Sequence, residues 1–285
     1  MKALRDKVAV ITGGGSGLGR ELASCCARRG MHVVLADVDE AGMQGTLARL
    51  GEEAPQIRCL ARRVDVAKLP EVEELAEFVW QQFGAAHLVF NNAGVSVNGP
   101  AWEYTEADWR WVLGVNLLGV AWGIKAFVPR LIAQGEGHVI NTASAAGWMS
   151  PPGSGIYNAT KAAVVSLSET LALDLKDAGA SIGVTVLCPA FFPTAIVDAA
   201  RNRPAELADT APPSELRLRR QEQMRQAVER GRLSAAQIAE ITLQAVEEGR
   251  FYVFPHPKVK ALVRARAEAV EREHDPFDPL AFRPS

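Results

Sequence analysis

The sequence predicts an α/β protein with a doubly wound, mainly parallel sheet of about seven strands and helices on both faces. Short β-rich runs alternate with longer helical patterns through the first 190 residues, which implies right-handed crossovers between parallel strands. The predicted strands are apolar on both faces, as residues 8–11 and 33–36 illustrate, and strands that are covered on both sides have this pattern. Because no linker divides the 285 residues, we expect a single domain over residues 1–285.

Each element is predicted from hydrophobic periodicity and from the turn residues that flank it. The predicted strands cover residues 7–12, 32–37, 57–64, 87–90, 138–142, 181–187 and 250–254. The predicted helices cover residues 17–30, 40–50, 69–83, 156–178 and 234–248, with one further long helix within residues 106–133.

The regular alternation stops after Pro189. Residues 190–232 contain four prolines and an Arg-, Glu- and Gln-rich stretch at 214–232, and so long a connection is often functional. We expect a substrate lid there that is mobile; a solvated surface helix over 214–232 is the alternative, because charged runs usually face water. The C-terminal part, residues 255–285, is predicted to be an amphipathic helix and a proline-containing tail.

A glycine-rich turn joins the first predicted strand to the first predicted helix. Residues 12–19 read TGGGSGLG. Without Cβ atoms, the backbone can bend tightly and approach a pyrophosphate, and the N–H groups at the helix start favour the anion. No Gly-Lys-Ser/Thr ends the turn, which excludes a Walker loop. The position in a βαβ unit predicts a Rossmann-type dinucleotide site that includes Gly13, Ser16, Gly17, Leu18 and Gly19.

Asp37 ends the second predicted strand, 18 residues after Gly19. A carboxylate at this place accepts hydrogen bonds from the hydroxyls of the adenosine ribose. It would also repel a 2′-phosphate, by roughly 4 kcal/mol for unit charges about 4 Å apart at an effective dielectric constant of about 20. Neither Ser16 nor Val38 supplies a compensating cation. We therefore expect NAD (NADH) rather than NADP; a surface aspartate that caps a helix at Asp39 is the alternative.

A tyrosine and a lysine stand four residues apart at the start of a predicted helix. This spacing places Tyr157 and Lys161 on one helix face. A nearby ammonium group should lower the pKa of the phenol from its reference of about 10 and make it a usable acid/base. Ser144 follows a predicted strand, at the sheet edge where open α/β sheets bind ligands. A tyrosine–lysine pair alone is common on protein surfaces, so the inference depends on the whole set.

Together, these motifs resemble the short-chain dehydrogenase/reductase family, in its common single-domain branch. The resemblance implies a Rossmann-type fold and an NAD(H)-dependent oxidoreductase that interconverts a secondary alcohol and a ketone. The matching pieces occur in the family's order within about residues 5–195: Thr12-Gly13-x-x-x-Gly17-x-Gly19, Asp65-Val66, Asn91-Asn92-Ala93-Gly94, Asn116, Ser144, Tyr157-x-x-x-Lys161 and Pro189 to Thr194.

The resemblance also implies a role for each matched residue. Tyr157 would exchange a proton with the substrate oxygen, Ser144 would hydrogen-bond that oxygen, and Lys161 would hold the nicotinamide ribose and tune Tyr157. Asn116 would hold a water in a proton relay, or would be a satisfied amide in a helix kink. Asn91 would support the sheet. The other implied cofactor contacts are Asp65, Val66, Asn92, Ala93, Gly94, Tyr157, Lys161, Pro189 and Thr194.

The turn after the sixth predicted strand departs from the family's usual Pro-Gly. This chain has Pro-Ala-Phe-Phe-Pro-Thr at residues 189–194, and the missing glycine and two aromatic rings should crowd the nicotinamide end. An apolar pocket for a hydrophobic or aromatic alcohol or ketone is expected near these motifs, with burial in the core as the alternative. Its predicted residues are Val95, Trp148, Met149, Phe191 and Phe192.

An acidic substrate is not indicated, because Lys161 is the only cation beside the catalytic motifs. Arginines on the expected lid, at positions 217, 219 and 220, could change that expectation. Overall, 31 basic against 33 acidic residues leave a net charge of −2, which gives no general attraction to nucleic acid or to an anionic membrane.

The cysteines and the N-terminal residues favour a cytoplasmic location. Residues 1–6 are polar, and the apolar run at 8–11 is too short for a signal sequence or a membrane span. The four cysteines form no Cys-x-x-Cys pair, and no Cys/His cluster has the spacing of a metal site. We expect buried thiols and no metal.

The helix predicted at residues 156–178 is apolar on more than one face. In the family that the chain resembles, such helices pair between subunits, so a homotetramer or homodimer is expected. A catalytically silent dinucleotide-binding regulatory or scaffold protein on the same fold is the alternative function, and the intact Ser144, Tyr157 and Lys161 weigh against it. A methyltransferase would leave these three residues unexplained.

Overall fold

The computed structural model of the protein describes residues 3–208 and 212–282. Its seven strands form one parallel sheet in the order β3-β2-β1-β4-β5-β6-β7, which confirms the predicted doubly wound α/β class. The strands are β1 (Val8–Thr12), β2 (His32–Asp37), β3 (Cys59–Arg63), β4 (Leu88–Asn91), β5 (Gly137–Thr142), β6 (Ile182–Leu187) and β7 (Tyr252–Val253).

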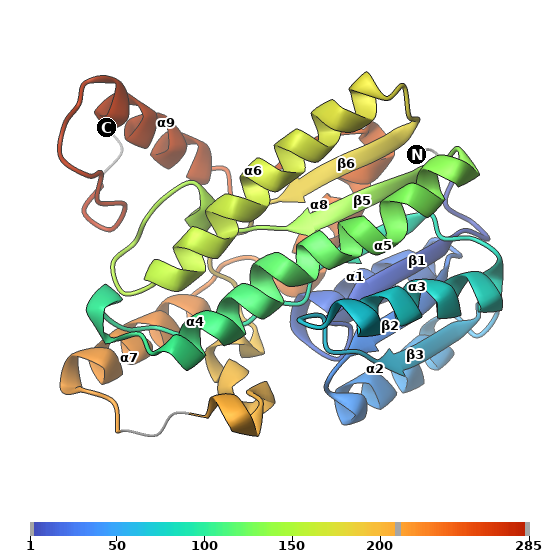
Figure 1. The fold of residues 1–285 in the computed structure, drawn as a ribbon, viewed down its shortest axis with the longest axis horizontal. Coiled ribbons are helices and arrows are strands. Elements are labelled where there is room, and N and C mark those ends of the chain that lie inside the picture. Colours follow the sequence, from blue (N-terminus) through green and yellow to red (C-terminus); the bar gives the residue numbers. More distant parts are fainter. Residues whose placement is uncertain (1–2, 209–211, 283–285) are drawn as a thin grey trace.

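Helices cover both faces of this sheet (Figure 1). One face carries α1 (Gly17–Arg28), α2 (Glu40–Glu53) and α8 (Ala235–Glu248). The other carries α3 (Leu69–Phe83), α5 (Gly119–Gln134) and α6 (Gly155–Asp177). From β1 to β3 the chain adds strands toward one edge of the sheet, and from β4 onward it adds them toward the other edge. Between β1 and β4 lies the point where this order switches, and α/β sheets bind ligands at such points.

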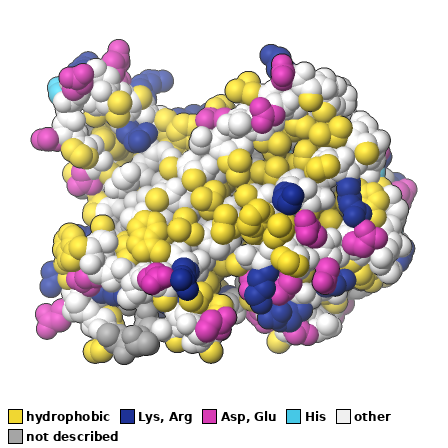
Figure 2. Space-filling model, viewed as in Figure 1, with side chains coloured by type: hydrophobic (Ala, Val, Ile, Leu, Met, Phe, Trp, Pro, Cys, Tyr) yellow, Lys and Arg dark blue, Asp and Glu magenta, His cyan; other side chains and the backbone are white. Residues whose placement is uncertain are grey.

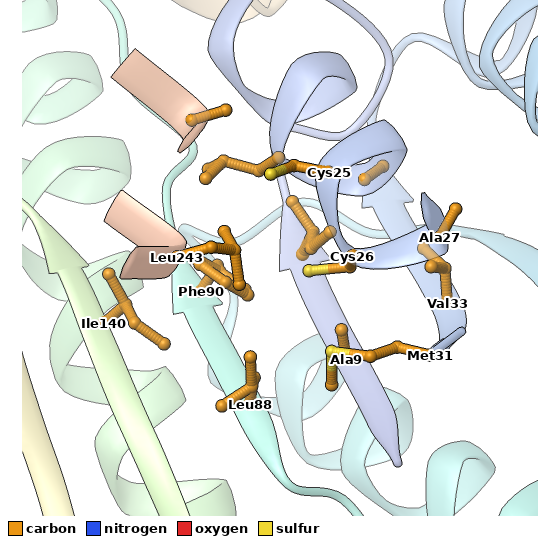
Figure 3. Packing of buried hydrophobic residues seen from close by; sticks show 14 of the residues in the cluster. Ala9, Cys25, Cys26, Ala27, Met31, Val33, Leu88, Phe90, Ile140 and Leu243 are labelled. Carbon is orange, nitrogen blue, oxygen red and sulfur yellow. The ribbon is translucent and has the colours of Figure 1, made fainter. Parts of the chain in front are cut away.

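Alternate residues of β1 point into opposite halves of the core. Ala9 and Ile11 pack on the side of α1 and α8, whereas Val8 and Val10 pack on the side of α3 and α5. This two-sided burial explains the continuous apolar runs in the sequence. On the α1 side, Cys25 and Cys26 point into the apolar packing (Figure 3). All four cysteines are free, and Cys59 is the one that is only partly buried.

The long helix expected within residues 106–133 is three consecutive segments. They are α4 (Glu106–Leu113), the π-helical turn η2 (Gly114–Leu118) and α5. The run Glu106–Gln134 is long and apolar enough to cross a membrane by length and composition, and 56% of its most apolar window is buried inside the protein, as in a helix that packs on a sheet. The π turn holds the buried Asn116.

The segment after β6 contains little regular structure before its first long helix. It forms the short 3-10 turns η4 (Ala195–Asn202) and η5 (Ala205–Leu207) and then α7 (Glu215–Glu229). In Figure 1 these orange elements lie below α4, at one end of the sheet. The last helix, α9 (Val259–Glu271), projects beyond the same end of the sheet, and the C-terminal tail folds back beside it.

Candidate functional site

A cavity of about 760 Å³ opens at the carboxyl ends of the strands. Its floor is made by the turns that follow β1 to β6, and its roof by η4, η5, α7 and α9. Most residues predicted from sequence for the cofactor, the chemistry and the substrate line it: Gly13, Ser16, Gly17, Leu18, Gly19, Asp37, Asp65, Val66, Asn92, Ala93, Gly94, Val95, Ser144, Met149, Tyr157, Lys161, Pro189, Phe191, Phe192 and Thr194.

The glycine-rich turn is a cradle that side chains would fill. Gly13 has a φ of +70°, a conformation that other residues rarely adopt. A Cβ on Gly19 would lie 2.0 Å from the carbonyl oxygen of Gly13, which is backbone and cannot give way. The side chain of Ser16, the N-cap of α1, makes no capping hydrogen bond. The backbone therefore comes close to the cavity at the start of a helix, which fits a pyrophosphate.

Asp37 joins the end of β2 to this turn. Its Oδ2 accepts a hydrogen bond from the backbone N–H of Gly15 (2.9 Å), and its Oδ1 accepts one from that of Asp39 (3.0 Å). Asp39, not Asp37, caps α2 by accepting from Gly42. The carboxylate of Asp37 is thus held at the edge of the cavity, where the ribose of a dinucleotide would lie.

Hydrogen bonds from the first strand fix the turn after β4. The hydroxyl oxygen of Thr12 accepts from the backbone N–H groups of Asn92 and Ala93, at 2.9 and 3.1 Å. The Asn92 side chain donates to the carbonyl oxygen of Thr12 (3.0 Å). Asn91 points away from the cavity and donates to Asn141, which agrees with the structural role expected for it. These contacts align the cradle with the centre of the site.

The end of β5 and the start of α6 bring Ser144, Tyr157 and Lys161 together. Ser144 follows β5 and lines the same cavity as Tyr157; its hydroxyl group donates to the carbonyl oxygen of Pro189 (3.3 Å) and accepts from the backbone N–H of Ala146 (3.1 Å). Lys161, one turn along α6 from Tyr157, is buried, and its Nζ donates to the carbonyl oxygen of Thr142 (2.7 Å). That Nζ lies 5.7 Å from the centre of the Tyr157 ring. A hydroxyl, a phenol and an amine therefore share one wall of the cavity.

Burial controls the protonation of this group. It raises the pKa of Tyr157 above the ordinary value of 10, although the hydrogen bond from Ser144 lowers it in part. Burial also lowers the pKa of Lys161 to about 8. The expected lowering of the phenol pKa by Lys161 is therefore wrong: burial disfavours the charged phenolate and is the largest influence, and Ser144 is the group that opposes it.

Two predicted residues lie outside the cavity. Trp148 packs on Tyr252 and Phe254, with ring centres 5.7 and 5.9 Å apart, and its indole N–H donates to Cys188. It is a core residue, and the prediction that it lines the pocket is wrong. The reason is that the 3-10 turn Ala145–Gly147 directs its side chain toward β7.

Asn116 is buried behind the cavity wall. Its Oδ1 accepts from the backbone N–H of Val95 (2.8 Å), and its Nδ2 donates to the Val95 carbonyl oxygen (3.0 Å). The Asn116 amide is therefore fully hydrogen-bonded within an irregular helical turn. This agrees with the second of the two roles that the sequence allowed for it. It fixes Val95, which does line the cavity.

The sequence missed most of the roof. Its apolar side chains come from short turns and from the C-terminal part, where the only signal was the break in the β/α pattern. They are Ile196, Val197, Ala199, Leu207, Met224, Val228, Val259, Leu262, Pro279 and Leu280. None of the three arginines considered at 217, 219 and 220 lines the cavity. Among the described residues, no group of His, Cys, Asp or Glu side chains is placed to hold a metal ion.

Comparison with known proteins identifies the family. Residues 7–205 match the short chain dehydrogenase family. A short-chain dehydrogenase/reductase from Burkholderia phymatum, solved in complex with NAD, is 46% identical, with a TM-score of 0.96 and coverage of 99% of this chain and 100% of the other. The "CLA biosynthesis dehydrogenase/reductase" of Lactiplantibacillus plantarum is 32% identical over 97% of both chains. A "C alpha-dehydrogenase" of Sphingobium is 33% identical over 95% of this chain and 87% of its own length.

The fold and the site thus define a nicotinamide-dinucleotide oxidoreductase of the Rossmann type. The chain belongs to the short-chain dehydrogenase/reductase family and is an enzyme that acts on CH–OH groups.

Proposed function

We propose that the protein interconverts a hydrophobic or aromatic secondary alcohol and its ketone with NAD(H), using Tyr157 as general acid and base. The observation that carries the proposal is the meeting of Ser144, Tyr157 and Lys161 beside the glycine cradle under an apolar roof. When bound, the nicotinamide supplies or accepts the hydride. A silent scaffold would have no need to keep all three side chains in one cavity.

The chain's own residues orient the substrate and move the proton. Ser144 holds the substrate oxygen within reach of the phenol, and Tyr157 donates its proton to that oxygen in reduction and takes it back in oxidation. The raised pKa keeps the phenol protonated at neutral pH, which suits ketone reduction. Lys161 lies beside the phenol, where its ammonium group can donate to a hydroxyl of the nicotinamide ribose.

The walls of the substrate side support a bulky apolar ligand. Val95, Met149, Phe191 and Phe192 line the cavity, together with the apolar roof. The buried Arg217, a candidate for binding an acidic substrate, is instead paired with Asp108 at 3.2 Å. Arg110 and Arg201 do line the cavity, but Arg110 is exposed and paired with Glu106 at 2.7 Å. An apolar pocket with a few polar groups is typical of a site for a small hydrophobic molecule.

A substrate panel tests this proposal. With NADH, we expect an aryl ketone to have a kcat/KM at least about tenfold above that of a small 2-keto acid, because the apolar walls gain contact only with the larger ligand. NADH absorbance gives the rates, and the Burkholderia protein in the same assay is a useful reference. A clear preference for the acid would contradict the substrate class; no turnover of any alcohol or ketone would contradict the reaction.

We further propose NAD as the preferred cofactor. Asp37 faces the place of the ribose. Two cations of the cavity wall, Arg63 and Lys68, lie 3.8 and 3.1 Å from Glu71. A 2′-phosphate would meet the Asp37 carboxylate at a cost of roughly 4 kcal/mol, from which any attraction to these two exposed cations is subtracted. The NAD complex of the Burkholderia relative supports this choice.

Substitution of Asp37 checks the cofactor preference. The wild type is expected to favour NADH over NADPH in kcat/KM by about 100-fold or more. Asp37→Asn removes the charge and keeps the shape, so the preference should fall by about tenfold or more, chiefly through a better KM for NADPH. Glu52→Gln, an exposed change on α2 away from the cavity, is the control. Equal efficiency of the wild type with both cofactors would remove the assignment.

A homotetramer or homodimer is also part of the proposal. Figure 2 shows hydrophobic side chains gathered over the face of α5 and α6, where Leu118, Ile132 and Leu173 are exposed. Such an exposed hydrophobic patch is typical of a contact surface between subunits.

A cytoplasmic location, and the absence of nucleic-acid and membrane partners, are proposed from the sequence composition alone. The expected mobility of residues 190–232 stays a prediction.

A further inference from the structure

A buried carboxylate on α4 holds the segment that roofs the cavity. The Asp108 side chain is 0% exposed, and its Oδ1 lies 2.8 Å from Nη1 of Arg203, which follows η4. Its Oδ2 lies 3.2 Å from Nη2 of Arg217 on α7. The two arginine side chains are 7% and 9% exposed. Two separate parts of the roof therefore meet at one carboxylate in the protein interior.

The helix that carries this carboxylate also fixes it. Asp108 Oδ2 accepts from the backbone N–H of Thr105, and the Thr105 hydroxyl oxygen accepts from the backbone N–H of Asp108, both at 3.0 Å. This reciprocal capping box starts α4. Because the cap holds Asp108 independently of the roof, its carboxylate is a prepared partner for the two arginines.

Arg203 connects this pair to the cavity wall. Its guanidinium lies 5.2 Å from the ring centre of Trp111, which lines the cavity. Its Nε donates to the carbonyl oxygen of Leu207, which also lines the cavity. A displaced Arg203 would therefore move η5 and expose one face of Trp111. The ion pair is thus coupled to the shape of the substrate side.

Arg217 connects it to the segment that leads into the catalytic helix. The Arg217 side chain packs against Gly99, and a Cβ added to Gly99 would lie 3.1 Å from the Cγ of Arg217. The backbone N–H of Gly99 donates to the carbonyl oxygen of Gly153 (3.0 Å), just before α6 begins. Arg220, one turn along α7, lies over Gly153 in the same way. The α7 helix is therefore seated on the turns that precede Tyr157.

We propose that Asp108, through Arg203 and Arg217, is a positioning residue that keeps η4, η5 and α7 closed over the substrate side and so determines preference for bulky substrates. The inference rests on the proposed function. The cofactor cradle and Asp37 belong to other elements, so dinucleotide binding should not depend on it. Each arginine reaches the carboxylate through a single Nη atom, and breaking a buried pair leaves a charge without its partner.

The test compares substrates of two sizes in Asp108→Asn. We expect KM for a bulky aryl ketone to rise about tenfold or more, whereas KM for a four-carbon ketone changes less than about twofold, because only the larger ligand touches the roof. The Kd for NADH, from its fluorescence, should stay within about twofold. Trypsin should cleave the native variant faster at Arg219 and Arg220 on α7, with fragments assigned by mass spectrometry.

A matched variant and a milder one keep the result decisive. Asp198→Asn breaks another ion pair of the same segment, Asp198 with Arg225 at 2.8 Å, which is exposed, and should leave all values as in the wild type. If Asp108→Asn does not fold, Arg217→Lys keeps the positive charge but replaces the guanidinium by an ammonium on a shorter side chain, and should show the same size-dependent rise in KM. Equal changes for both ketones, or none, would overturn the inference. A wild type without turnover would refute the proposed function, and the trypsin experiment would still report on the ion pair.

Discussion

Tyr157→Phe is expected to lower kcat by about 10²–10⁴-fold while NADH binding is retained. The phenol is the group beside Ser144 that can give a proton to a substrate oxygen, and Phe keeps the ring that packs in the cavity wall. The loss should appear in kcat and kcat/KM together, because the proton contact strengthens only in the transition state. Steady-state rates and NADH fluorescence on the same preparation measure both.

The control for this change is Tyr252→Phe. Tyr252 is exposed, its hydroxyl group donates to Glu169, and it does not line the cavity, so loss of this hydroxyl group should not affect the rates.

The rate of alcohol oxidation by the wild type should rise with pH beyond pH 9, because the base is the deprotonated Tyr157 phenol and burial raises its pKa above 10. Tyr157→Phe should abolish that rise. Full activity in the variant would mean that another group moves the proton.

Gly19→Ala is expected to weaken NADH binding by roughly 100-fold or more and to destabilise the protein by about 1–3 kcal/mol. The new methyl group would lie 2.0 Å from the Gly13 carbonyl oxygen and 2.9 Å from Asn92 Nδ2. The turn must therefore open, and its backbone N–H groups would no longer point toward the pyrophosphate. Titration of NADH fluorescence and thermal unfolding measure the two effects.

Gly51→Ala is the matched control. Gly51 lies in α2, and a Cβ there meets nothing within 4 Å. Alanine is the better helix former by about 1 kcal/mol, so the variant should be as stable or more stable and should bind NADH normally. Unchanged NADH affinity in Gly19→Ala would show that the turn is not the pyrophosphate site.

The sequence predicted the floor of the site residue by residue, but the roof only as a segment, the lid expected over residues 190–232. Gly13, Asp37 and Tyr157 belong to short motifs whose spacing is set by a single turn, strand or helix, so local rules place them at the carboxyl edge of the sheet. Val228 and Val259 reach the same cavity from elements far along the chain. Their positions depend on how α7 and α9 pack, and no local spacing records that.

Two predicted residues show the same limit. Trp148 adjoins the catalytic motif in sequence but turns to Tyr252 and Phe254, because a large ring goes where the most apolar surface is buried. Asn116 has both ends of its amide bonded to Val95. Residue type and order were compatible with a pocket position for Trp148, and packing decided otherwise; for Asn116 the structure adds the contacts that hold its side chain, and the relay stays a prediction.

By itself, the sequence determined the parallel sheet, the order of its seven strands and of the helices between them, and the chemical groups on the floor of the site. These features follow from hydrophobic periodicity and from turns of a few residues, because neighbouring residues in the chain decide the backbone conformation of each strand, helix and turn. Only the tertiary structure decided that Arg217 turns to Asp108 and not to the substrate, and that Tyr157 keeps a raised pKa. Both outcomes depend on the removal of charges from water, which is set by all the elements that pack around a group together.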